Sequence, residues 1–395
     1  MTHATRFQAR FRPSPQTFFV EEVPAYLPCG SGEHTFLWME KRGMTTLAAI
    51  DELARRLGVP AREIGYAGMK DRHATTRQWL SAPRVPPEAA VTPPTEGATG
   101  ARVLRAERHA NKLRVGHLRA NRFTVHLGDV RDPAEARALV AGLDELTRAG
   151  LPNRYGDQRF GAISSNVEEG IALLRREVPA TGERRGGGPR DHRRRKLLLS
   201  AVQSAVFNQV LERRLAGGRL RRVLPGDILQ KTDNGGVFYT DDPELDQARV
   251  DTGAVVITGP MPGSWARAPA EGTPARAIED EALAAVGVTR DELAALGKEL
   301  PGARRPLWVP VALEDQPLRE TPPAPEQVRT EVRTEARPDD AGPGVVMLSF
   351  RLPAGTYATV LLSALGVAVE RAAGAEPADA ARPDLSPDAP GLAHQ

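Results

Sequence analysis

The sequence predicts an α+β fold, because helical and strand patterns alternate along the chain and short turns join the strands. One amphipathic helix is expected to begin at Thr45 or Thr46, with apolar residues on one face, and to end at Gly58. A second is expected to begin at Asp132 and to end at Gly150. Short connections of this kind favour α+β over a doubly wound parallel sheet.

The remaining elements follow from two patterns: apolar runs or alternation for strands, and the helical spacing of apolar residues for helices. Alternating or short apolar runs predict strands over residues 19–23, 35–41, 64–67, 102–130 (two or three strands) and 345–350. Apolar residues in helical register predict helices over 197–215 and 280–300. A small module of strands and turns is expected over 223–258.

Composition limits the class of protein. A chain of 395 residues with 41% hydrophobic residues can form two domains of ordinary size. The single cysteine, Cys29, excludes an internal disulfide and a cysteine-rich zinc site, which fits a reducing compartment. No apolar leader follows Met1 and no apolar run reaches membrane-spanning length, so a soluble cytoplasmic protein without membrane contact is expected.

Basic residues are concentrated in one block. From Arg175 to Arg222 there are fourteen Lys/Arg against four Asp/Glu, whereas the net charge of the whole chain is only +3. Such a block is typical of a surface that binds a polyanion, because Arg and Lys replace the counterions of phosphates. The alternative is a solvated arm, which the run Gly186–Pro189 favours for part of the block.

The most informative stretch is Gly65–Leu80, in which a short apolar strand breaks at Gly68 into a polar loop and becomes apolar again at Trp79. The run Gly-Met-Lys-Asp-Arg-His-Ala-Thr-Thr-Arg-Gln, residues 68–78, resembles the signature of the TruD family of pseudouridine synthases. In that family the nucleophilic aspartate follows the lysine. The resemblance therefore implies that Asp71 is the catalytic nucleophile and that Lys70 supports the site or contacts RNA.

The resemblance extends along the chain. The run Asn153–Gly161 is similar to the entry of the family's inserted domain, and Leu352–Thr359 is similar to its closing motif. The family fold implies a pseudouridine-synthase catalytic domain with a mixed, largely antiparallel sheet and an inserted α+β TRUD domain. We therefore expect a catalytic domain over 1–150 and 303–374 and an inserted domain over 151–302. Composition, and not the resemblance, predicts a disordered excursion over 314–343, which is rich in Pro, Glu and Arg, and a disordered tail over 375–395, which is rich in Ala, Pro and Asp.

The family resemblance also assigns substrate-binding residues. Aligning Pro15–Phe18 with a family motif places Arg12 where relatives carry a lysine beside the nucleophile. Phe123 stands where the family has a phenylalanine that stacks on the flipped base. Asn121 is expected either to bind the uracil edge or to hold the end of the strand. Periodicity alone indicates instead that Phe123 is a core residue of an alternating strand. Gln158 and Arg159 are expected to contact RNA.

The reaction implied is the isomerisation of a uridine, at position 13 of tRNA, to pseudouridine. A carboxylate suits this reaction because it can attack C1′ or steer the 2′ hydrogen and then leave, with no metal and no cofactor. The partner is tRNA and the enzyme is expected to be a monomer. Two alternatives stay open: another RNA substrate, and an RNA-binding protein that has kept the fold without the chemistry. A zinc deaminase is excluded, because its Cys-x-x-Cys ligands are missing.

Overall fold

The computed structural model describes residues 7–92, 100–130, 132–156, 160, 165–175, 189–313 and 344–370, and these form two compact units. The first unit contains the chain up to Gly150 and again from Pro310, and the second runs from Leu151 to Val309. The sequence predicts that the first unit resumes at residue 303. Strand β12 (Ala303–Pro306) pairs instead with β11 (Val255–Met261) of the second unit, which moves the boundary to Val309. The predicted disordered segments lie outside the described residues.

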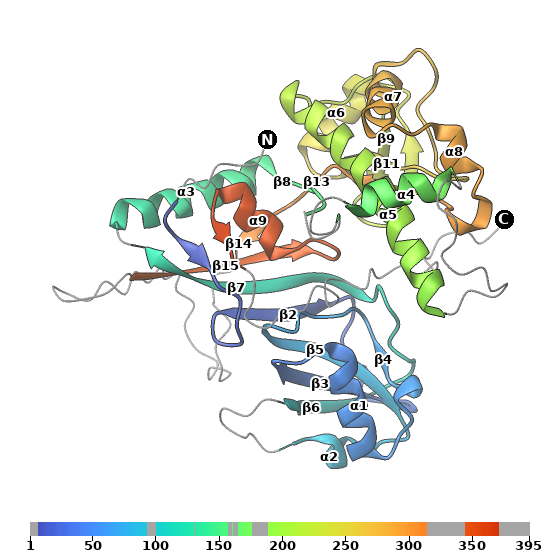
Figure 1. Ribbon diagram of the computed structural model, residues 1–395. Coiled ribbons are helices and arrows are strands. Elements are labelled where there is room, and N and C mark those ends of the chain that lie inside the picture. Colours follow the sequence, from blue (N-terminus) through green and yellow to red (C-terminus); the bar gives the residue numbers. More distant parts are fainter. Residues whose placement is uncertain are drawn as a thin grey trace. The chain divides into compact units, whose positions relative to one another are not determined.

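The first unit is built on a ten-stranded sheet (Figure 1). Its strands are β1 (Arg10–Phe11), β2 (Phe18–Pro24), β3 (His34–Arg42), β4 (Gly65–Tyr66), β5 (Thr75–Pro83), β6 (Gly100–His109), β7 (Leu118–Val130), β14 (Ala312–Leu313), β15 (Gly344–Pro353) and β16 (Ala368–Val369). The main path is β14-β15-β7-β2-β5-β3-β6. Among the described strands of this sheet only the β2–β5 and β1–β16 pairs are parallel, which confirms a mixed, largely antiparallel sheet.

Helix α1 (Thr46–Leu57) covers one part of this sheet, as the apolar periodicity predicts. The Thr45 hydroxyl caps its first turn by accepting a hydrogen bond from the Ala48 amide at 3.1 Å. Gly58 ends it in the left-handed conformation, with φ of 66°. The buried face of α1, which includes Leu53, belongs to one apolar cluster with Leu37 of β3 and residues of β5 and β6.

Three further helices complete the described part of the first unit: α2 (Pro87–Ala90), α3 (Pro133–Ala149) and α9 (Ala358–Leu365), together with a 3₁₀ turn η1 (Ala61–Glu63). Asp132 caps α3 through the Ala134 amide at 2.7 Å, and the helix ends at Gly150, as predicted. Figure 1 shows α3 and α9 beside each other near β7, and both helices bury leucines. The C-terminal segment thus completes a sheet that the N-terminal 150 residues begin.

The second unit has its own small sheet and core. Its strands are β8 (Leu151–Pro152), β9 (Ile228–Lys231), β10 (Val237–Tyr239), β11, β12 and β13 (Trp308–Val309), and its helices are α4 (Ser165–Leu174), α5 (Pro189–Ala216), α6 (Pro243–Asp251), α7 (Pro274–Val286) and α8 (Arg290–Ala294), with a 3₁₀ turn η3 (Gly297–Glu299). Strands β10-β9-β11-β12 form an antiparallel sheet. Residues of α5 such as Val206 and Phe207 are fully buried against it.

The helix predicted over 280–300 is wrong as a single element. It begins earlier, at Pro274, and α7 ends at Gly287, where φ is 82°. A new helix, α8, then begins with a capping box between Thr289 and Glu292. The glycine and the cap signal are both local, so they override the apolar period that continues through them.

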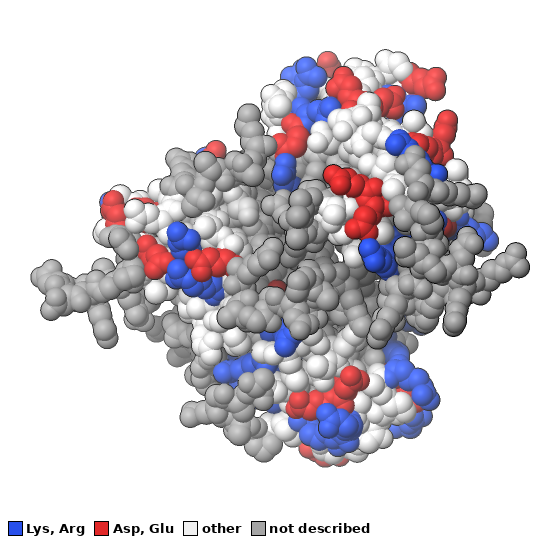
Figure 2. Space-filling model, in the orientation of Figure 1, with Lys and Arg blue, Asp and Glu red and all other residues white. Residues whose placement is uncertain are grey.

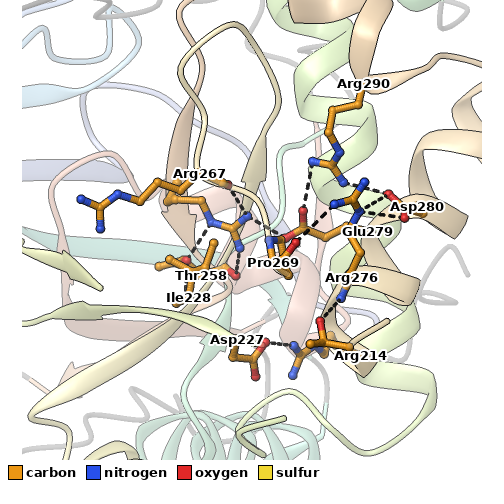
Figure 3. A network of polar contacts seen from close by, with 12 residues as sticks. Arg214, Asp227, Ile228, Thr258, Arg267, Pro269, Arg276, Glu279, Asp280 and Arg290 are labelled. Carbon is orange, nitrogen blue, oxygen red and sulfur yellow. Dashed lines mark hydrogen bonds and ion pairs between the residues drawn. The ribbon is translucent and has the colours of Figure 1, made fainter. Parts of the chain in front are cut away.

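Buried carboxylates of the second unit are paired with arginines (Figure 3). Arg304 donates to Glu279 at 2.6 Å, and both side chains are almost fully buried. Arg214 of α5 pairs with Asp227. Burial holds the pKa of Asp227 above its usual range, and Arg214 opposes this shift only in part. A buried carboxylate without such a partner would destabilise the fold by several kcal/mol. These pairs therefore join β12 to α7, and α5 to the residue that precedes β9.

Candidate active site

Asp71 lies on the loop between β4 and β5 and is exposed to solvent. Its Oδ1 accepts a hydrogen bond from the backbone amide of His73 at 2.8 Å, which makes an Asx turn. This contact fixes the direction of the carboxylate and leaves it exposed at the surface of the first unit. A fixed and exposed carboxylate is the arrangement that attack on a sugar carbon requires.

Hydrogen bonds to buried side chains hold the loop in place on both sides of Asp71. The Gln78 amide donates to the Gly68 carbonyl at 2.9 Å, and the Lys70 amide donates to the Thr46 hydroxyl at 2.9 Å. Beyond the loop, the Thr75 hydroxyl donates to the Pro15 carbonyl at 2.7 Å. Gln78 and Thr46 are both buried. The loop is thus anchored to the start of α1 and to β5, which are rigid elements.

Lys41 of β3 is a buried cation beneath the loop that the sequence analysis missed. Its Nζ donates to the backbone carbonyl of Asp71 at 2.6 Å and to that of Met44 at 2.8 Å. Burial lowers the pKa of Lys41 to about 7. The charge of Lys70 also lowers this pKa, whereas the charge of Asp71 raises it. The signal was in the sequence: Lys41 follows Leu37 and Met39 on the inward face of an alternating strand.

Lys70 lies inside the unit and is not available to an RNA phosphate. Its Nζ forms an ion pair with Glu22 Oε2 at 2.9 Å, and the two side chains are 3% and 0% exposed. Glu22 Oε1 also accepts from the Trp79 amide at 3.3 Å. Of the two roles expected for Lys70, support of the site or contact with RNA, this burial favours support: the pair joins the loop to β2.

Asn121 stands opposite Glu22 in the pairing of β2 with β7. Its Oδ1 is buried and has no hydrogen-bond partner within the described part of the chain. Buried acceptors are normally satisfied, so an open one is a candidate position for a donor of a ligand. The predicted contact between Asn121 and the uracil edge stays a prediction, and this open acceptor supports it.

Phe123 is a core residue in this structure. It is 5% exposed, and its ring packs between Phe18 and Phe350, with centroid distances of 6.2 and 5.6 Å. Because both neighbours are aromatic side chains of the sheet, the ring offers little surface to a base. The periodicity of the strand thus describes Phe123 better than the stacking role inferred from the family.

Replacing Phe123 separates the two roles. We expect Phe123→Ala to lower the free energy of unfolding by about 3–5 kcal/mol, because it leaves a cavity between two rings. Phe123→Leu should keep most of the stability and most of the turnover, since it fills much of the volume without offering a π-face. Thermal melts and single-turnover assays on the same preparations measure both. Normal melting of Phe123→Leu with a large loss of turnover would restore the stacking role.

Arg12 forms its ion pairs with carboxylates other than that of Asp71. Its exposed guanidinium pairs with Asp129 and with Glu370, each at 2.8 Å, and the hydrogen bonds to Glu370 and Asp129 hold the pKa of Arg12 above its usual range. Both partners belong to the edge of the sheet where β1 meets β7 and β16. The structure therefore corrects the expectation that Arg12 is the cation beside Asp71. Lys41 donates to the backbone carbonyl of Asp71 and not to its carboxylate, so it holds the main chain of the loop.

Gln158 and Arg159 lie outside the described residues, so their predicted RNA contacts stay predictions. The motif that precedes them is well anchored in the second unit. The amide of Tyr155 donates to Asn208 Oδ1 at 2.9 Å, and the Asn153 side chain donates to the Pro306 carbonyl at 2.9 Å.

Much of the basic block is neutralised by carboxylates. Arg194 pairs with Glu169 at 2.7 Å, Arg175 with Glu292 at 3.0 Å, and Arg195 with Glu299. On the face drawn in Figure 2, Lys and Arg side chains are interspersed with Asp and Glu. Residues 176–188 of the block lie outside the described residues. The described part of this block therefore presents less net positive charge at the surface than its count of Lys and Arg indicates.

Metal-binding clusters and membrane-spanning helices are both absent from the described part of the chain. No group of three or more His, Cys, Asp or Glu side chains there is arranged to hold a metal ion. No described helix is both long and apolar enough to cross a bilayer.

Comparison with known proteins identifies the family. The model of the family "tRNA pseudouridine synthase D (TruD)" matches residues 1–181 and 191–365. A tRNA pseudouridine synthase D of Anaeromyxobacter sp. (strain Fw109-5) is 43% identical over 357 residues, which are 90% of this chain and 91% of the relative. A Thermus thermophilus protein of the same name is 40% identical, and the match covers 89% of this chain and 86% of the Thermus protein.

A solved structure has the same fold. The crystal structure of a putative tRNA pseudouridine synthase D from Methanosarcina mazei superposes with a TM-score of 0.68, at 20% identity, and covers 93% of this chain and 96% of its own. At that identity the likeness concerns the fold alone. The family model and the curated relatives extend over most of the chain, and the chain belongs to the tRNA pseudouridine synthase D family.

Proposed function

We propose that this protein isomerises a uridine of tRNA to pseudouridine and that Asp71 is its nucleophile. The observation that carries the proposal is the exposed Asp71 carboxylate, on a loop anchored by Thr46, Gln78 and Lys41, in a chain of the tRNA pseudouridine synthase D family. The modified nucleotide is uridine 13. The enzyme acts as a monomer in the cytoplasm.

The reaction needs one carboxylate and no redox step. In one route Asp71 attacks C1′ of the ribose, the N1–C1′ bond breaks, and its electron pair leaves with the uracil. In the other, Asp71 steers removal of the 2′ hydrogen while the same bond breaks. In both routes the free uracil turns and C5 bonds to C1′. In the first route the C1′–O bond to Asp71 breaks at this step and releases the carboxylate, and in the second the proton that Asp71 took from C2′ returns to C2′. The C5 proton then passes to water while N1 gains one. Atoms and electrons balance in both routes.

Each neighbour of Asp71 has a distinct part in this scheme. Lys41 binds the main chain of Asp71, so it fixes the position of the nucleophile rather than touching the substrate. The Glu22–Lys70 pair fixes the preceding residue. The open Oδ1 of Asn121 can accept the N3–H of the uracil, which would hold the base while it turns.

We assign the two compact units to the two domains that the family resemblance implies. The first unit is the catalytic domain, because it carries Asp71 on the loop between β4 and β5 and Asn121 on β7. The second, Leu151–Val309, is the inserted TRUD domain. This assignment differs from the sequence expectation by extending the insert from residue 302 to Val309, where the paired strands β8 and β13 close it.

The test is turnover on an unmodified tRNA transcript. Pseudouridine is tagged with a carbodiimide and located by reverse-transcription stops, and we expect a single stop at position 13. A transcript with cytidine at that position is the control. A stop elsewhere would replace the proposed position, whereas tight binding without any pseudouridine would favour the alternative of an RNA-binding protein without the chemistry.

A further inference from the structure

The first unit has a pocket whose lining residues are distinct from those of the Asp71 loop. It is a pocket of about 450 Å³, within the range of about 300–1,000 Å³ typical of ligand pockets. Its lining combines aromatic rings, one amide and two cations: Tyr26, His109, Asn111, Lys112, Arg114 and His117. Most of these residues belong to the connection between β6 and β7.

The aromatic part of the pocket is fixed by contacts within the protein. The Tyr26 hydroxyl and His117 Nδ1 are hydrogen-bonded at 2.6 Å. The Tyr26 ring stacks on His109 with a centroid distance of 5.2 Å, and His109 in turn packs on Phe36 at 4.3 Å. Because the rings are already held, a flat ligand would lose little free energy to ordering them.

The charge of the pocket is not neutralised. Lys112 donates to the Arg62 carbonyl at 3.1 Å, but within the described part of the chain neither Lys112 nor Arg114 forms an ion pair. Nδ1 of His109 is buried without a hydrogen-bond partner there. From Arg105 to Arg119 the sequence has five Lys/Arg (105, 108, 112, 114, 119) and one Glu (107). The site thus carries positive charge beside a flat aromatic surface.

The pocket is attached to the segment that leads into the Asp71 loop. The Gly116 amide donates to the Ala67 carbonyl at 2.8 Å, and the Leu113 amide donates to the Ser81 hydroxyl at 2.9 Å. A Leu118 methyl lies 3.7 Å from where a Cβ at Gly68 would stand. A ligand in the pocket would therefore be held in a fixed relation to the loop that carries Asp71.

We propose that this pocket binds an unpaired nucleotide of the RNA substrate, at a position other than the modified uridine. The base would lie against the aromatic rings with its edge towards Asn111, and Arg114 and Lys112 would contact its phosphates. Aromatic side chains beside cations are the combination by which proteins bind single-stranded RNA. The proposal rests on the proposed function, because it takes tRNA as the substrate.

The test compares two double variants that lose the same charge. Lys112→Gln/Arg114→Gln removes the pocket cations, and Arg55→Gln/Arg137→Gln removes two exposed arginines of α1 and α3. We expect the pocket variant to raise Kd for the tRNA transcript about tenfold and to flatten the slope of log K against log salt by about 1–2. The control should change both much less and should keep the single-turnover rate at saturating tRNA within about twofold of wild type.

A second measurement identifies the base. Ultraviolet cross-linking of the tRNA complex, followed by mass spectrometry, should place a nucleotide adduct on Tyr26 or a neighbouring lining residue. Equal effects of the two double variants, or adducts only outside the pocket, would overturn the proposal. Pocket-specific loss of binding without any pseudouridine from wild type would keep the RNA subsite and reject the isomerase. Normal turnover with no pocket-specific effect would reject the subsite alone.

Discussion

Replacing Asp71 by Asn is expected to lower single-turnover formation of pseudouridine by at least about a thousandfold, which corresponds to about 4 kcal/mol of transition-state free energy. The amide has neither the charge nor the nucleophilicity of the carboxylate. Its oxygen can still accept the hydrogen bond from the His73 amide, so the loop should keep its shape. The melting temperature and Kd for tRNA should therefore stay close to those of wild type.

A matched control is Asp51→Asn, which changes the same charge at an exposed position of α1. It should leave turnover unchanged. If the Asp71→Asn variant retains more than about a thousandth of wild-type turnover, with deamidation excluded by mass spectrometry, the nucleophile is another group. An equal loss in both variants would point to an effect of net charge rather than of one carboxylate.

Local sequence signals predicted the first unit well. Thr45 and Gly58 delimit α1 as expected, and Asp132 and Gly150 delimit α3, because caps act within a few residues. The same kind of signal was overlooked at Gly287, where it divides the predicted helix in two. Where the first unit resumes depends on the pairing of β12 with β11, which no local pattern encodes.

The candidate site likewise has some features that local sequence predicts and others that depend on long-range pairing. The motif around Asp71 located the loop, since its polar residues are contiguous. The partners beneath it are not contiguous: Glu22 and Lys41 reach the loop only because β2 and β3 both pair with β5. Arg12 was misplaced for a similar reason, because its partner Glu370 is 358 residues away in the chain. Long-range pairing decides which charges meet, and a single sequence does not show it.

The buried Glu22–Lys70 pair should have a large effect on the stability of the first unit. Lys70→Met leaves the Glu22 carboxylate buried and without its cation, so we expect the first unit to lose about 3–5 kcal/mol of unfolding free energy. The double change Glu22→Gln/Lys70→Met removes both charges and should recover much of that loss. An exposed pair in the same unit, Arg84 with Glu63, is the control, and Arg84→Gln should cost less than about 1 kcal/mol.

Hydrogen exchange of peptides from β2 and β5 measures this loss in the first unit separately from the second. The double-mutant cycle then gives the coupling between the two side chains. A strong coupling, together with slower turnover in Lys70→Met at temperatures where the unit stays folded, would show that the pair positions the Asp71 loop as well as stabilising the sheet. If Lys70→Met costs no more than Arg84→Gln, the buried charge is satisfied in another way, and the supporting role assigned to Lys70 is wrong.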